Sequence, residues 1–126
     1  MNVGILIITH SDIGKQMLLT ATSVYGTNPF HVELLSVDNF DQPTDVIKLG
    51  QKYVNFLDNG DGVLVLTDII GTTPSNIAKS IKHNKIRVVA GLNLSMILNV
   101  FNYPKYSLDK LADIAIEGGV DGIMKL

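Results

Sequence analysis

Two short apolar stretches constrain the fold of this chain more than any other feature. Residues 2–9 are rich in valine and isoleucine, and residues 62–67 are continuously apolar as far as the closing threonine. Neither stretch alternates apolar with polar side chains, which is typical of strands buried on both faces of a parallel sheet. The first stretch halts at His10 and the second at Asp68.

Weaker patterns of the same kinds fill the rest of the chain. Further strands are predicted at 31–37, 86–90 and 120–126. Helices are predicted from Ser11 to near Gly26 and over 42–58, 75–81, 94–101 and 107–117. Such alternation predicts an α/β fold, a single-domain open and mostly parallel sheet with helices on both faces. The common strand order for this fold is 2-1-3-4, here with a C-terminal edge strand. No linker or repeat divides residues 1–126.

Composition excludes several classes of function. The formal net charge of −2 leaves no excess of lysine and arginine to bind nucleic acid or an anionic membrane. Because the chain has no cysteine, disulfides, thiolate catalysis and cysteine-based zinc sites are excluded. The N-terminal apolar stretch lacks a basic region before it and is too short to span a bilayer, so we expect a soluble cytoplasmic protein.

The strand order predicts where the chemistry lies. If the first and third strands are neighbours, His10 and Asp68 meet at the topological switch point, where open α/β sheets bind their ligands. An aspartate that accepts a hydrogen bond from one imidazole nitrogen leaves the other nitrogen free to attack. Backbone N–H groups at Ser11 and in the Gly71-Thr72-Thr73 loop would then point at an anion. This set suits a phosphoryl group, and no serine-hydrolase elbow or Walker loop is present.

The same residues have plainer interpretations. His10 could simply lie where a strand becomes a loop, and Asp68 and Thr73 could only cap the loop and helix near them. His31 and His83 are expected to be solvated surface residues, and three histidines without clustered carboxylates do not predict a metal site. The apolar stretch 94–101 is expected to be core or dimer interface in preference to a sugar pocket.

Three segments together resemble a known family. They are ITHSDIG at 8–14, VLVLTDIIGTTPSNIA at 63–78 and VVAGLNLSMIL at 88–98. They are similar to the mannose-type enzyme IIA domains of the bacterial phosphoenolpyruvate-dependent sugar phosphotransferase system, over nearly the whole chain.

The resemblance implies a phosphoryl carrier without a cofactor. His10 would accept phosphate from phospho-HPr on Nε2 and pass it to an enzyme IIB, with Asp68 bonded to Nδ1. Thr73 stands where the family has a serine or threonine that binds the phosphoryl group. Family members are dimers that share a C-terminal strand, which 120–126 would supply here. Contact with a membrane would be indirect, through a transporter complex.

Three departures from the family pattern bear on the sugar and the IIB partner. Thr72 replaces a glycine, Ile70 an aromatic residue and Ser95 a proline. The sequence ends at Leu126 without a fused IIB domain, so the IIB partner is expected on a separate chain. Two other functions stay open: a IIA-like phosphoryl donor subunit for a dihydroxyacetone kinase, and a non-enzymatic regulatory or ligand-binding module.

Overall fold

A four-stranded parallel sheet forms the centre of the computed structural model, which describes all residues from 1 to 126. Its strands are β1 (Gly4–His10), β2 (Val32–Val37), β3 (Val63–Thr67) and β4 (Ile86–Ala90). They lie in the order β2-β1-β3-β4, and every neighbouring pair is parallel. The predicted fold class and strand order are therefore confirmed.

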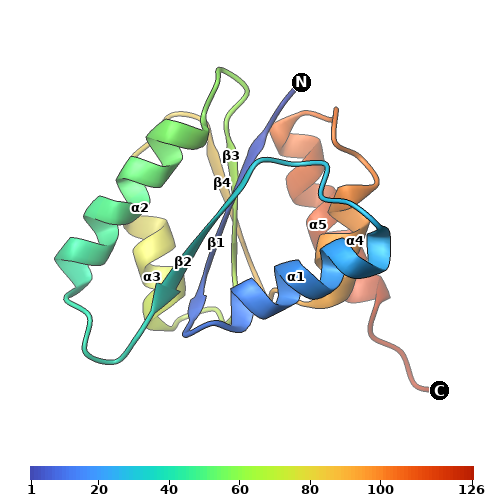
Figure 1. Ribbon diagram of the computed structural model, residues 1–126, viewed down its shortest axis with the longest axis horizontal. Coiled ribbons are helices and arrows are strands. Elements are labelled where there is room, and N and C mark those ends of the chain that lie inside the picture. Colours follow the sequence, from blue (N-terminus) through green and yellow to red (C-terminus); the bar gives the residue numbers. More distant parts are fainter.

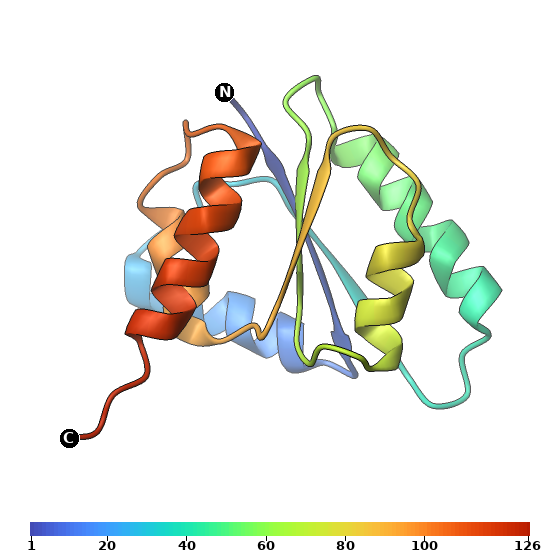
Figure 2. The same cartoon turned by 180° about the vertical axis from the view of Figure 1, so that it is seen from behind.

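Five helices cover the two faces of this sheet. They are α1 (Ile13–Tyr25), α2 (Pro43–Leu57), α3 (Thr73–Ser80), α4 (Leu94–Phe101) and α5 (Leu108–Asp121). Helices α2 and α3 lie on one face, and α1, α4 and α5 lie on the other (Figures 1 and 2). None of the helices combines the length and the apolar character needed to cross a membrane.

Alternate side chains of β1 supply the two halves of the core. Leu6 and Ile8 pack in the layer formed with α2 and α3, whereas Ile5 and Ile7 pack against the other helices. Since all four side chains are buried, the unbroken apolar character of this strand follows from its central place in the sheet. His10, two residues beyond Ile8, continues on the α2 and α3 face.

Helix α4 belongs to the core, as one of the two interpretations of its apolar sequence predicted. Its buried residues join the larger core cluster together with residues of β1, β3 and α5. They are Met96, Ile97, Val100 and Phe101. A sugar pocket at this helix is therefore not supported.

The predicted final strand over 120–126 is wrong for the single chain. Helix α5 continues through Asp121, and the last residues adopt no strand conformation. Gly118 and Gly119 do not end the helix, because both are buried against α4, where a Cβ on Gly118 would collide with the side chain of Asn99. The two glycines thus permit close helix packing, and the segment after them has no neighbouring strand to pair with.

Candidate functional site

The ends of β1 and β3 bring His10 and Asp68 together at the carboxyl edge of the sheet. The two strands are parallel neighbours with Ile8 opposite Thr67, so the residues that follow emerge side by side. From this point the chain crosses to β2 on one side of β1 and to β4 on the other side of β3. The pair thus occupies the topological switch point.

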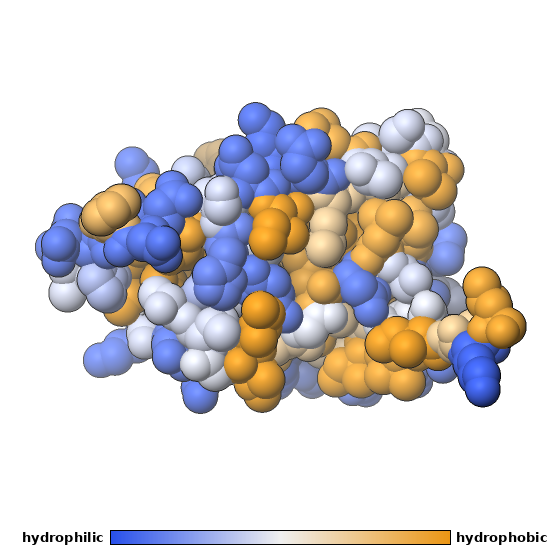
Figure 3. All heavy atoms as spheres, turned by 90° about the horizontal axis from the view of Figure 1, so that it is seen from below, coloured by the Kyte–Doolittle hydropathy of each residue, from blue (hydrophilic) through white to orange (hydrophobic).

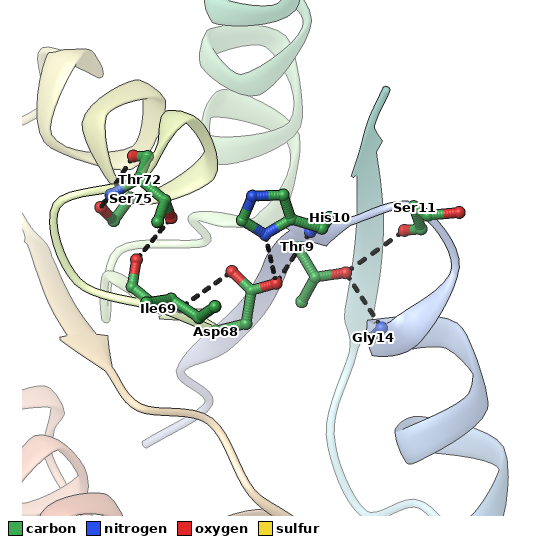
Figure 4. Close-up of polar contacts among 8 residues, drawn as sticks. All are labelled: Thr9, His10, Ser11, Gly14, Asp68, Ile69, Thr72 and Ser75. Carbon is green, nitrogen blue, oxygen red and sulfur yellow. Dashed lines mark hydrogen bonds and ion pairs between the residues drawn. The ribbon is translucent and has the colours of Figure 1, made fainter. Parts of the chain in front are cut away.

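Asp68 holds His10 through both its ring and its backbone. Oδ2 of Asp68 lies 2.8 Å from Nδ1 of His10 and accepts the backbone N–H of His10 at 2.9 Å (Figure 4). The other oxygen, Oδ1, accepts the backbone N–H of Ile69 at 2.9 Å. An ionised carboxylate can only accept, so the proton of the neutral ring lies on Nδ1 and the lone pair on Nε2.

The electrostatics of Asp68 favour this arrangement. Burial alone would raise the pKa of its carboxyl group. The hydrogen bonds from the backbone and ring of His10 and from the backbone of Ile69 outweigh it and lower the pKa below its ordinary value. The side chain of Asp68 is 9% exposed, whereas that of His10 is 41% exposed. The carboxylate is therefore fixed in the protein while the imidazole remains open to a reaction partner.

The turn after His10 is tied down by Thr9, a residue that the sequence did not single out. Thr9 is buried, and its hydroxyl oxygen accepts the backbone N–H of Gly14 at 3.0 Å and donates to the carbonyl of Ser11 at 3.3 Å (Figure 4). Ser11 itself has a φ of 47°, and its backbone N–H donates to Val37. The backbone N–H of Ser11, a predicted phosphoryl ligand, is thus committed within the protein.

In the loop that contains Gly71, Thr72 is hydrogen-bonded within the loop, whereas the hydroxyl of Thr73 is not. The hydroxyl of Thr72 donates to the carbonyl of Ile69 at 2.6 Å, and its backbone N–H donates to the hydroxyl of Ser75 at 3.1 Å. Thr72 therefore braces the loop, and neither donor faces an incoming anion. Gly71 has a φ of 78°, a conformation that favours glycine. Thr73, by contrast, is exposed at the first turn of α3, and its hydroxyl has no hydrogen-bond partner within the chain.

A cavity of about 200 Å³ lies beside His10. Its walls come from the ends of β1 and β2, from the loop after β2 and from the starts of α2 and α3. The residues are His10, Val37, Asp38, Asn39, Asp41, Pro43 and Thr73. The cavity places His10 and Thr73 on the same space, with the N-terminus of α3 facing it. The partial positive charge of a helix N-terminus stabilises an anion there.

The other two histidines lie outside this site. His31 is exposed, as predicted, with Nε2 3.7 Å from Oε1 of Glu33. The prediction for His83 is wrong, because its side chain is only 20% exposed and Nε2 lies 2.6 Å from Oδ2 of Asp58. These partners come from two different loops at the amino edge of the sheet, and nothing in the local sequence pairs them.

The chain matches a family and several solved structures. A family model described as "PTS system fructose IIA component" matches residues 4–115. No curated protein matches the sequence significantly.

Three solved structures share the fold over nearly their whole length. The mannose/sorbose specific IIA subunit of the phosphotransferase system from Enterococcus faecalis has a TM-score of 0.86 at 23% identity, covering 100% of this chain and 96% of that one. The phosphotransferase system component EIIA from Streptococcus agalactiae has a TM-score of 0.83 at 26% identity, covering 98% of this chain and 96% of that one. The PTS IIA protein associated with the fucose utilization operon from Streptococcus pneumoniae has a TM-score of 0.80 at 24% identity, covering 98% of this chain and 93% of that one.

The family match extends over most of the chain and includes both strands that carry the candidate site. With the shared fold, it assigns a phosphotransferase-type role in the sugar phosphotransferase system. The chain therefore belongs to the mannose-type IIA family, whose members carry phosphoryl groups in that system.

Proposed function

We propose that this chain carries a phosphoryl group on Nε2 of His10, receiving it from phospho-HPr and passing it to an enzyme IIB on a separate chain. One observation carries the proposal: Asp68 holds Nδ1 at 2.8 Å while the ring remains 41% exposed beside a cavity. A fixed Nδ1–H leaves the Nε2 lone pair as the nucleophile. The reaction would take place in the cytoplasm.

The transfer step exchanges one phosphorus–nitrogen bond for another. The Nε2 lone pair attacks the phosphorus of the donor's phosphohistidine, and the donor's bond to phosphorus breaks with its electron pair returning to the donor imidazole. The ring of His10 gains positive charge as the new bond forms, and the ionised Asp68 stabilises that charge. Passing the group to the IIB protein repeats the same exchange, with His10 as the leaving group.

Thr73 and the start of α3 are suited to bind the transferred group. The free hydroxyl of Thr73 can donate to a phosphoryl oxygen, and its backbone N–H, at the first position of α3, lies at the favourable end of the helix dipole. Because phosphoryl transfer depends mainly on positioning and charge stabilisation, these few groups suffice for a carrier.

A labelling experiment tests the proposal. Incubation with phosphoenolpyruvate, enzyme I and HPr should place one acid-labile phosphate on the protein, and phosphorus NMR should assign it to Nε2 of a histidine. Failure of the wild-type chain to incorporate phosphate would contradict the proposal. Supplying candidate IIB chains, and separately a dihydroxyacetone kinase, to the phosphoprotein then identifies the acceptor.

The proposal includes a homodimer that shares its C-terminal segment. Beyond α5, Ile123 and Met124 are 75% and 71% exposed. Strand β4 has a neighbour on one side only, and an apolar cavity of about 190 Å³ lies at its end beside α5. Sedimentation velocity should show a dimer for the full chain and a monomer for a chain truncated after Gly122. Equal masses would contradict an exchange of this segment.

A further inference from the structure

The loop between β2 and α2 carries an aromatic side chain that the proposed chemistry does not use. Phe40 is 95% exposed in this loop, which comprises residues 38–42 and forms a wall of the cavity beside His10. Figure 1 shows the loop extending beyond the end of the sheet, at the lower left between β2 and α2. The exposed ring therefore lies on the same edge of the molecule as the reactive imidazole.

Hydrogen bonds across the loop fix the turn that presents Phe40. The backbone N–H of Asp38 donates to Oδ2 of Asp41 at 2.8 Å, and the backbone N–H of Asp41 donates to the carbonyl of Asp38 at 3.1 Å. Because the turn is already closed, the loop backbone loses little further freedom when a partner covers the ring. Large aromatic side chains presented in this way are typical binding anchors.

The surroundings of Phe40 are acidic. Asp38, Asp41 and Asp45 are all exposed, and the carboxylate of Asp38 has no hydrogen-bond partner within the chain. A second cavity, of about 510 Å³, lies on the other side of the loop, and no lysine or arginine lines either cavity. Figure 3 views this edge of the molecule and shows separate apolar patches among hydrophilic ones. A surface of this charge complements a basic partner.

We infer that the 38–42 loop recognises the protein that phosphorylates His10, an inference that rests on the proposed function. The donor would present an apolar recess bordered by lysine or arginine, with Phe40 entering the recess and Asp38 and Asp41 facing the cations. The donor arrives carrying a phosphoryl group, which the acidic loop repels. It therefore needs basic groups beside its phosphohistidine, a demand that an unphosphorylated acceptor does not share.

Truncation of the aromatic ring tests the inference directly. For transfer from phospho-HPr, kcat/KM should be about tenfold lower in Phe40→Ala than in the wild type. The loss should come from a higher KM, with kcat unchanged. Phe56→Ala is the matched control, because Phe56 is also an exposed phenylalanine but lies near the far end of α2. Equal kcat/KM values for wild type and Phe40→Ala would overturn the inference.

Removal of one charge tests the electrostatic part. Asp38→Asn should lower kcat/KM about threefold at low ionic strength, and the difference should vanish in high salt, where exposed charges are screened. Asp113→Asn on α5 removes an exposed carboxylate on the other face of the sheet and should change nothing. A salt-independent loss in Asp38→Asn would contradict charge pairing with the donor.

Phosphoramidate, a small phosphoryl donor, separates docking from chemistry. It should label wild type and Phe40→Ala at equal rates and leave His10→Ala unlabelled. Slower labelling of Phe40→Ala would mean that the loop shapes the site, and a change in its sedimentation would mean that a second copy covers Phe40; either result overturns the inference. If the defect appeared only in transfer to IIB, the donor assignment would be wrong. An unlabelled wild type would instead reject the proposed function.

Discussion

Two histidine–aspartate pairs lie at opposite ends of the same helix, α3. His10 and Asp68 meet beside its N-terminus, and His83 and Asp58 meet just beyond its C-terminal end at Ser80. In each pair a ring nitrogen lies within 2.8 Å of one carboxylate oxygen of the aspartate. The other oxygen accepts a backbone N–H from the loop that follows the aspartate. The local chemistry of the two pairs is thus nearly the same.

Their orientation and exposure differ. His10 uses Nδ1 and is 41% exposed, whereas His83 uses Nε2 and is 20% exposed. Asp58 also accepts the backbone N–H groups of Gly60 and Gly62, so this pair joins the loop before β3 to the loop before β4. No hydrogen bond within the chain holds the second ring nitrogen of either histidine, so the exposure of the ring separates His10 from His83.

The helix dipole adds to this difference. An anion is stabilised near the N-terminus of a helix, and a protonated histidine is stabilised near its C-terminus. A phosphoryl group is therefore favoured beside His10 and disfavoured beside His83. Both histidines have the hydrogen bond to an aspartate, so that bond alone does not identify a phosphoryl carrier. The proposal for His10 rests in addition on its position at the helix N-terminus and on the exposure of its ring.

Exchange of each histidine for alanine tests this comparison most strongly. His10→Ala should lower phosphate incorporation from phospho-HPr by about 1,000-fold or more, because the nucleophile is lost. His83→Ala should be labelled at the wild-type rate. The measurement is acid-labile phosphate per chain after incubation with the phosphoryl donors. Label retained on His10→Ala would mean that another residue carries the phosphoryl group.

Substitution of the two aspartates should also affect the phosphorylation rate differently, by a smaller factor than substitution of the two histidines. Asp68→Asn should slow phosphorylation about 100-fold, since the neutral amide no longer fixes the proton on Nδ1 or stabilises the charged ring. Asp58→Asn should leave the rate unchanged. Single-turnover transfer from phospho-HPr measures both. An unaltered rate in Asp68→Asn would reduce Asp68 to a structural cap of its loop.

For the free energy of unfolding, substitution in the Asp58 pair should have the larger effect and substitution in the His10 pair the smaller one. Asp58→Ala removes the acceptor for two backbone N–H groups and for His83, so it should lower the free energy of unfolding by about 2 kcal/mol. His10→Ala removes one hydrogen bond to Asp68 but keeps its two backbone N–H donors, so it should lower that free energy by less, about 1 kcal/mol. Urea unfolding followed by circular dichroism gives both values. Equal stabilities would show that the Asp58 pair does not hold the two loops together.

Acid should remove the contribution of Asp58. Burial, the largest influence, raises the pKa of Asp58, but hydrogen bonds from Gly60, Gly62 and His83 outweigh it and lower the pKa below its ordinary value. Because the folded pKa is the lower one, the stabilisation is present above the ordinary aspartate pKa of about 3.9 and is lost as the pH falls through the folded value. The stability difference between wild type and Asp58→Ala should therefore be constant near pH 6 and shrink below about pH 4. A difference independent of pH would exclude the carboxylate charge as its source.

Much of the architecture could be predicted because the decisive signals are local. The unalternating stretch of β1 reports burial on both faces, which only a central parallel strand requires. The short connections between strands and helices then limit the strand order to few alternatives. The juxtaposition of His10 and Asp68 followed from that order and from no feature of either residue alone.

Features that depend on contacts between loops could not be predicted. The partner of His83 lies 25 residues away in another loop, and Thr72, which the sequence presents as a phosphoryl ligand, uses its donors within its own loop. The exposed Phe40 stands between two aspartates in a predicted loop, a signal that was available but does not reveal the turn that holds it.

The sequence by itself determined the α/β class, the strand order and the edge at which His10 and Asp68 meet, because apolar periodicity records how each segment is buried. Tertiary structure alone decided which nitrogen of each histidine is bonded, which hydroxyl stays free and where α5 ends. Those outcomes depend on the directions of single hydrogen bonds and on close packing between segments distant along the chain. His10 and His83 differ for that reason.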